Sequence, residues 1–154
     1  MKEINKMKIE IKANLDNVAI IRVALSSFIS TLDITIDELM DIKTAISEAV
    51  TNAIEHAYPE DKKEEALVFV TAYIYSYEED IVKVEIEDTG IGIEDVDTAM
   101  LPTYTSKPEL EHAGMGFTIM ETFMDEILID SNKDEGTKIT LTKKIKKKKS
   151  KAVN

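Results

Sequence analysis

The apolar residues of this chain recur at two different periods, and the order of these periods constrains the fold more than any other feature. Alternation at period two predicts strands, whereas spacings of three and four residues predict amphipathic helices. The predicted strands are residues 7–13, 67–77, 81–87, 126–130 and 137–145, and the predicted helices are residues 18–32, 35–58 and 116–125. The order βααββαββ predicts an α+β fold, with a mixed, mostly antiparallel sheet and helices on one face.

Local signals support these boundaries. Thr35 and Glu38 have the spacing of a capping box, which starts the second helix, and Pro59 prevents that helix from continuing. The charged residues 59–65 are predicted to form a loop. Residues 89–116 contain no long periodic segment beyond one helical turn near residues 95–100. A loop of this length within a compact domain usually carries function.

Length and composition exclude several classes of protein. With 154 residues, we predict one domain over residues 1–145, followed by a disordered, lysine-rich tail over residues 146–154. The chain has no cysteine, which excludes a disulfide scaffold, a zinc ribbon and a thiol nucleophile. It also lacks a run long and apolar enough for a membrane helix and a signal-peptide pattern. We therefore expect a cytoplasmic protein.

The charge is distributed unevenly. Seven of the 19 basic residues are lysines at or after Lys143, so residues 1–142 carry 12 basic and 30 acidic residues, a net charge of −18. A body of this charge repels nucleic acid and favours a basic protein partner or a cation-bridged ligand. The terminal lysines could form a patch for nucleic acid or membrane, but we favour a solvated tail. We expect neither direct nucleic-acid binding nor membrane binding.

Three polar residues in the second predicted helix share one face. Glu48, Asn52 and His56 are each four residues apart, so they stack along the helix. A carboxylate and an amide oxygen one turn apart can approach a hydrated Mg²⁺ together, since this ion prefers oxygen ligands and keeps several waters. The same spacing also fits a solvated polar face, so alone it does not define a site.

A second candidate feature directly follows a predicted strand. Asp88 places an acceptor at the strand's end, and Gly90 and Gly92 permit positive φ and close approach of a ligand to the backbone. A carboxylate at this place can accept a hydrogen bond from an exocyclic amine such as that of adenine. A simple tight turn is the alternative interpretation.

The third feature is the glycine pair that precedes the last predicted helix, in the run Gly114-Met-Gly116. A helix N-terminus with free N–H groups attracts anions, and glycine lets a phosphate come close. An ordinary glycine-containing helix start fits equally well. Together, however, an amine acceptor, a cation-binding face and a phosphate-binding helix start predict a nucleoside triphosphate site. That site is not a P-loop, because the chain contains no such motif.

The same segments carry a resemblance to a known family. Glu48-Ala-Val-Thr-Asn52, Asp88-Thr-Gly-Ile-Gly92 and Gly114-Met-Gly116 resemble the N, G1 and G2 boxes of the GHKL ATPases, which include gyrase B, Hsp90, histidine kinases and MutL. Residues 47–58 and 105–121 resemble the small anti-sigma factors of that family, which are protein-serine kinases. The resemblance implies a two-layer α/β sandwich of the Bergerat ATP-binding type, with residues 89–116 as the ATP lid.

The resemblance also implies residue roles in a serine kinase that uses Mg-ATP and releases ADP. Glu48 is implied to be the catalytic general base that deprotonates the serine hydroxyl, and Asn52 to hold the magnesium ion. Asp88 is implied to bind the adenine amine, with Thr137 as a second contact. The implied ATP-binding residues are Asn52, Asp88, Gly90, Gly92, Ile93, Thr105, Ser106, Lys107, Gly114, Met115, Gly116, Phe117 and Thr137.

One position departs from the family pattern. Where relatives carry an arginine just before the lid glycines, this chain has His112. Histidine is only partly protonated near neutral pH, so a γ-phosphate contact there would be weaker or pH-dependent. Lys107 is the nearest fixed positive charge that could replace it. The role of His112 therefore stays open.

Two protein partners and a homodimer are further implications of the resemblance. One partner is a sporulation sigma factor, sigma F, which the protein holds away from RNA polymerase, and the other is an anti-anti-sigma factor that is inactivated by serine phosphorylation. Arg22, the only arginine of the chain, lies where relatives contact both partners. The homodimer is implied to use the N-terminal strand and first helix, although that helix could simply cover the sheet.

Three other functions are alternatives to this one. A general-stress anti-sigma kinase belongs to the same class, and the regular Asp88-Thr-Gly-Ile-Gly92 run favours the sporulation type. A nucleotide-gated binding module without significant catalysis is a second alternative. A histidine-kinase catalytic domain is disfavoured, because the chain leaves no room for a helix pair with a phosphoacceptor histidine.

Overall fold

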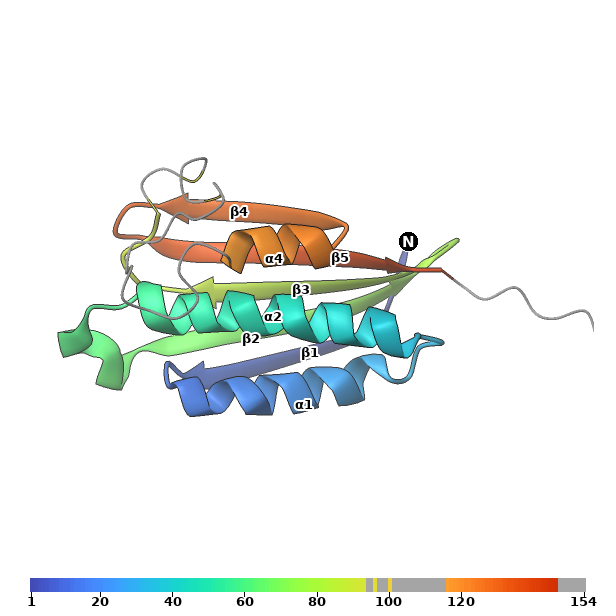
Figure 1. The fold of residues 1–154 in the computed structure, drawn as a ribbon, viewed down its shortest axis with the longest axis horizontal. Helices are drawn as coiled ribbons and strands as arrows, with labels where there is room; N and C mark the ends of the chain where they lie inside the picture. The colour runs from blue at the N-terminus through green and yellow to red at the C-terminus, as the bar shows by residue number, and fades with distance from the viewer. Residues whose placement is uncertain (94–95, 97–99, 101–115, 147–154) are drawn as a thin grey trace, which may run out of the picture.

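Five strands form one sheet in the order β1-β2-β3-β5-β4 (Figure 1). The computed structural model describes residues 1–93, 96, 100 and 116–146. The strands are β1 (Lys2–Lys12), β2 (Leu67–Ser76), β3 (Asp80–Asp88), β4 (Glu126–Asn132) and β5 (Gly136–Ile145). All four neighbouring pairs are antiparallel, so the described strands contain no parallel pair and the sheet is not mixed.

The α-helices of the described residues cover one face of this sheet, as expected for the α+β class (Figure 1). They are α1 (Val18–Ile29), α2 (Ile36–His56) and α4 (Gly116–Phe123), with short 3-10 helices at Leu15–Asn17 and Glu60–Glu65. The second 3-10 helix replaces the loop predicted for residues 59–65. No helix in the described part of the chain has the length and apolar character needed to cross a membrane.

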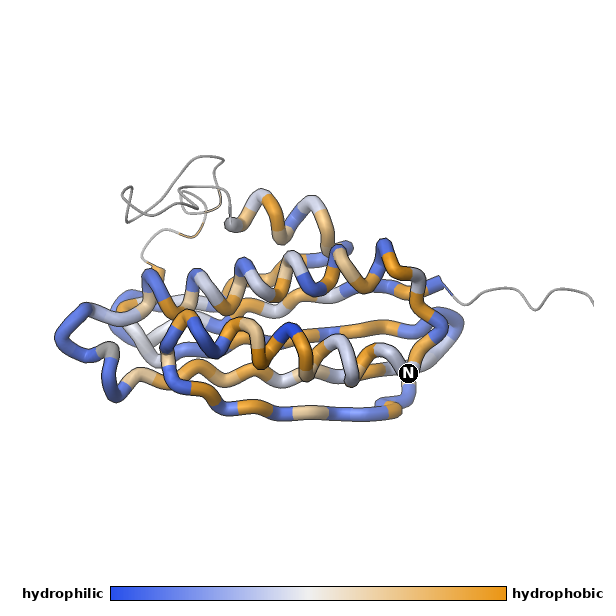
Figure 2. Tube along the Cα trace, turned by 60° about the horizontal axis from the view of Figure 1, so that its bottom comes forward, coloured by the Kyte–Doolittle hydropathy of each residue, from blue (hydrophilic) through white to orange (hydrophobic). Residues whose placement is uncertain are grey.

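The core lies between the helices and the sheet. Val82, Val84 and Ile86 of β3 are buried at every second position, while Lys83 and Glu85 point to the open face and form an ion pair of 3.5 Å. Figure 2 shows this separation along the chain, with apolar stretches in the strands and hydrophilic turns at both ends. Burying each such apolar side chain contributes about 1.5–3 kcal/mol, which fixes the face that each strand presents to the helices.

Helix α2 is the central helix of this layer, and its start is set locally. The Thr35 hydroxyl accepts from the Glu38 N–H at 3.1 Å, and the Glu38 carboxylate accepts from the Thr35 N–H at 3.0 Å. The predicted capping box is therefore confirmed. Ile42, Ile46 and Val50 are fully buried on the sheet side of α2, which leaves the opposite side of the helix for polar residues.

The first lysine of the C-terminal run is a structural residue. Lys143 lies in β5, donates to the carbonyl oxygen of Phe123 at 2.7 Å and forms an ion pair of 3.8 Å with Asp41. Its ammonium group thereby caps the C-terminal end of α4, where the helix dipole favours positive charge, and ties it to α2. The sequence pattern places Lys143 in a predicted strand, but only tertiary packing gives its ammonium group this role.

Two boundaries differ from the sequence prediction or remain untested. β1 begins at Lys2 instead of residue 7, because Lys2 also pairs with Ser76 of β2. A bulge between Glu3 and Asn5 interrupts the alternating pattern in this first part of the strand. It is an edge strand that pairs only with β2 among the described residues. The predicted disordered tail lies outside the described residues after position 146, so that prediction stays a prediction.

Candidate nucleotide-binding site

The polar face of α2 is turned away from the sheet. Ala45, Ala49 and Ala53 are buried against the core, whereas Glu48 and Asn52 are half-buried one helical turn apart. The Oε2 atom of Glu48 is itself shielded from solvent. The small alanines let α2 lie close to the sheet, and the 3.6-residue period then directs Asn52 to the side of α2 that borders α4, with Glu48 one turn before it.

Asn52 meets the first residue of α4. A Cβ atom added at Gly116 would lie 2.5 Å from the Asn52 amide nitrogen, so only glycine leaves room for this side chain. The contact joins two predicted site residues that are 64 positions apart in the sequence. It also places the N-terminus of α4 beside the amide that is the candidate magnesium ligand.

Asp88 ends β3 as a buried carboxylate. Its Oδ1 atom accepts from the N–H groups of Gly90 at 3.0 Å and Thr137 at 3.3 Å. Both bonds end on the same oxygen, so Oδ2 is the oxygen that can accept from a ligand. Burial raises the pKa of Asp88 to about 6, and the two hydrogen bonds only partly oppose this desolvation effect.

The segment after Asp88 is attached to the end of α2. The Tyr58 hydroxyl donates to the carbonyl oxygen of Leu67 at 2.6 Å and accepts from the Thr89 N–H at 2.9 Å. The Ile91 N–H donates to the carbonyl oxygen of Ala57 at 2.7 Å. The α2 face and Asp88 therefore lie at the same end of the molecule. The sequence pattern indicates Tyr58 only as a helix end and does not predict a role for its buried hydroxyl.

Two site glycines make room for the protein's own backbone. A Cβ at Gly90 would lie 2.0 Å from the Ala57 carbonyl oxygen, and one at Gly92 would lie 1.9 Å from the Asn132 carbonyl oxygen. Gly92 also has a φ of 72°, a conformation that other residues rarely adopt. Neighbouring chain segments therefore require glycine at both positions, and the expectation that these glycines also let a ligand approach the backbone stays a prediction.

A hydroxyl cluster adjoins Asp88 at the β4–β5 end of the sheet. Thr137 is buried, and its Oγ1 atom lies 2.7 Å from the Ser131 Oγ atom. Ser131 in turn accepts from the Ile93 N–H at 2.7 Å. Sequence analysis missed Ser131, although a signal exists: it continues the alternation of Ile127 and Ile129, so a polar residue occupies a position on the helix-covered face.

The remaining predicted site residues divide into two groups. Phe117 is half-buried in the first turn of α4 and packs against the core, and His56 is half-buried in the last turn of α2. Six predicted lid residues lie outside the described residues, namely Thr105, Ser106, Lys107, His112, Gly114 and Met115.

The side chains of the candidate site suit a magnesium ion that is bound mainly through water and phosphate oxygens. Among the described residues, no group of three or more His, Cys, Asp or Glu side chains could hold a metal ion. A magnesium ion bound through water and phosphate oxygens needs only one or two protein ligands. Asn52, on a rigid helix and beside the α4 N-terminus, is chemically suited to be such a ligand.

Asp88 should make the stability of the free protein pH-dependent. Because its pKa in the folded protein is about 6, above the ordinary 3.8, the folded state binds more protons than the unfolded state between these values. The free energy of unfolding should therefore fall as pH rises through this window, by up to about 3 kcal/mol. We expect Asp88→Asn to raise the free energy of unfolding at pH 7.5, and this gain to shrink by about half at pH 5.

Urea unfolding of both proteins at the two pH values measures this effect. Asp130→Asn is the matched control, because it removes the same charge from an exposed side chain of β4 and should change stability by less than about 0.5 kcal/mol. A destabilised Asp88→Asn protein, or a gain that does not depend on pH, would show that burial of the Asp88 charge is not costly.

The chain is similar to known proteins of one ATPase class. Residues 11–143 match the histidine kinase-like ATPase domain, and the chain belongs to this family. Within it, the chain is 54% identical to an anti-sigma F factor of Clostridium perfringens over 92% of this chain and 97% of that protein. It is 51% identical to an anti-sigma F factor of Clostridium beijerinckii over 91% and 94% of the two chains.

Solved structures agree on the fold. The RsbU and RsbW domains of a Mycobacterium tuberculosis protein match with a TM-score of 0.61 at 22% identity, covering 90% of this chain and 32% of that chain. The mycobacterial sensor histidine kinase MprB matches with a TM-score of 0.52 at 13% identity, covering 92% and 99%. The fold expected from the GHKL resemblance is thereby confirmed.

Proposed function

We propose that this chain is an anti-sigma factor and a serine kinase that uses Mg-ATP. The observation that carries this proposal is the meeting of three segments at one end of the molecule: the polar face of α2, the Asp88 turn and the start of α4 (Figure 1). The two anti-sigma F factors of the Clostridium species, similar over nine-tenths of this chain, support the same function.

In this proposal each residue of the site has one task. Asp88 accepts a hydrogen bond from the adenine amine, and Thr137 makes a second contact with the base. Asn52 contributes an amide oxygen to magnesium, which supplies charge neutralisation at the phosphates when bound. Glu48 takes the proton of the attacking serine hydroxyl as the Oγ–phosphorus bond forms and the bond to the ADP leaving group breaks.

The substrate serine belongs, in this proposal, to an anti-anti-sigma factor, and sigma F is the partner held when that factor is inactivated. Helix α1 supports a protein-binding role, because Ile20 and Val23, three residues apart on one side of the helix, are 53% and 72% exposed. Large apolar side chains exposed together are typical of interfaces. The edge strand β1 and helix α1 would also form the homodimer.

The test is a pull-down of both partners with the purified chain in ATP and in ADP. We expect sigma F to be retained preferentially with ATP and the anti-anti-sigma factor with ADP, and labelled γ-phosphate to be transferred to serine of the latter. Equal recovery in both nucleotides contradicts the switch. Nucleotide-dependent binding without transfer indicates a gated binding module instead of a kinase.

Arg22→Ala tests the partner surface separately. We expect it to weaken binding of both partners by on the order of tenfold or more, because a central interface arginine often contributes about 2 kcal/mol. ATP binding should not change. Lys144→Ala is the matched control, since it removes one positive charge from an exposed position of β5, outside the proposed interface of α1 and β1. If both variants weaken binding equally, the effect is one of overall charge and Arg22 has no specific role.

A further inference from the structure

Ser131, near the end of β4, forms a three-way junction beside the Asp88 turn. Its Oγ atom lies 2.7 Å from the Ile93 N, 3.0 Å from the Gly136 carbonyl oxygen and 2.7 Å from the Thr137 Oγ1. These partners belong to the loop after β3 and to the first two residues of β5. One small hydroxyl therefore connects three segments of the candidate base-binding region.

The chemistry of the three partners determines the direction of each bond. A backbone N–H can only donate and a carbonyl oxygen can only accept, whereas a hydroxyl has one hydrogen and two lone pairs. Ser131 can make all three bonds at once in one way: it accepts from Ile93, donates its single hydrogen to Gly136, and accepts from Thr137. The hydrogen-bonding capacity of Ser131 is then complete, and the hydroxyl hydrogen of Thr137 is committed.

Because the Thr137 hydroxyl donates its hydrogen to Ser131, it can act only as an acceptor toward a ligand. Thr137 also adjoins Asp88, whose Oδ1 accepts from the Thr137 N–H at 3.3 Å. Two neighbouring acceptors suit a purine with an amino group at C6. They disfavour a base with a C6 carbonyl, which would place an acceptor opposite them. A freely rotating threonine hydroxyl would adapt to either base and would not discriminate.

We propose that Ser131 is a positioning residue that determines base specificity by committing the Thr137 hydroxyl as an acceptor. This inference rests on the proposed function, namely ATP binding at Asp88 and Thr137. It adds that discrimination between a 6-amino and a 6-oxo purine depends on a side chain that does not itself contact the base. Ser131 acts through Thr137, while Asp88 provides the remaining part of the discrimination.

Calorimetric titration of the full chain with ATP and with inosine triphosphate tests this inference through the ratio of the two dissociation constants. We expect Ser131→Ala to reduce the preference for ATP by about fivefold to tenfold, the value of roughly one hydrogen bond. Ser131→Thr retains the hydroxyl and should keep the preference within about twofold. Thr137→Val should reduce it like Ser131→Ala, and the double variant should lose no more than either single variant.

The possible results separate this inference from the proposed function. If the wild-type chain does not bind ATP, the proposed function is wrong and the inference falls with it. If the wild-type chain prefers ATP and Ser131→Ala keeps the full preference, only the inference is wrong. If Ser131→Ala weakens the binding of both nucleotides equally, Ser131 has a purely structural role, and this result also overturns the inference.

Discussion

Replacing Glu48 with glutamine is expected to slow serine phosphorylation by about 10²–10⁴-fold, the usual contribution of a general base. Glutamine keeps the shape and helix preference of the side chain but cannot take a proton. Because Glu48 projects from the rigid middle of α2 and Asp88 lies at the end of β3, we expect ATP affinity to stay within about twofold. Single-turnover transfer from labelled ATP measures the chemical step, and calorimetric titration measures binding.

The control for this variant is Glu121→Gln, which removes the same charge from an exposed position of α4. Its transfer rate should match that of the wild-type chain. Transfer undiminished in Glu48→Gln contradicts the general-base role. A parallel loss of transfer and ATP affinity would mean that Glu48 acts in nucleotide binding instead of proton transfer.

Gly136→Ala should be strongly destabilising. Gly136 has a φ of 90°, and an added Cβ atom would lie 2.2 Å from the Asp88 carbonyl oxygen. The backbone strain and the steric conflict together should lower the free energy of unfolding by about 2–4 kcal/mol. Urea unfolding measures this loss, and ATP binding should weaken as well because Asp88 has to shift.

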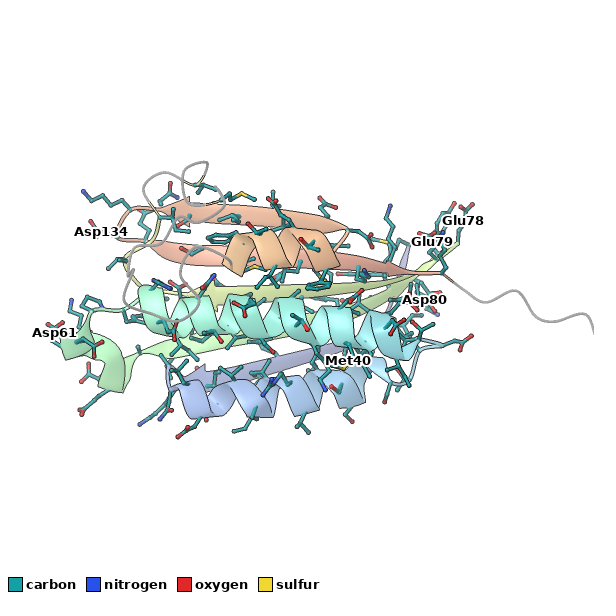
Figure 3. The ribbon with its side chains drawn as sticks, viewed as in Figure 1. Met40, Asp61, Glu78, Glu79, Asp80 and Asp134 are labelled. Carbon is teal, nitrogen blue, oxygen red and sulfur yellow. The ribbon has the colours of Figure 1, made fainter. Side chains whose placement is uncertain are left out.

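A variant in the same turn is expected to have the opposite sign. Asp134, at the tip of the β4–β5 turn in Figure 3, has a φ of 63° although it is not glycine. Asp134→Gly should therefore raise the free energy of unfolding by up to about 1 kcal/mol. If Gly136→Ala and Asp134→Gly both change stability by less than about 0.5 kcal/mol, backbone conformation in this turn is not a significant constraint.

Several elements could be predicted because their signals are local. The capping box of Thr35 and Glu38 involves residues three apart, and it forms as the sequence indicates. The placement of Glu48 and Asn52 on one face of α2 follows from helical geometry alone. The start of β1 could not be predicted in this way, because pairing of Lys2 with Ser76 depends on a partner strand distant in the sequence.

The contacts between the motifs required the tertiary structure. Asn52 and Gly116 are far apart in the chain, and no local pattern specifies that a Cβ atom would not fit between them. Likewise, the sequence does not show that the backbone carbonyl oxygens of Ala57 and Asn132 leave no room for a Cβ atom at the two glycines after Asp88. A residue type restricts which conformations are allowed, but the neighbour that makes use of the restriction is set by chain topology.

The sequence by itself determined the α+β class, the helix-face alignment of Glu48 with Asn52 and the resemblance to GHKL ATPases, because periodicity and motifs are properties of neighbouring residues. Only the tertiary structure decided that Ser131 adjoins Thr137, that Lys143 caps α4 and that Asp88 is buried enough to raise its pKa. These properties depend on which distant segments exclude water from a side chain and which polar atoms remain within hydrogen-bonding distance.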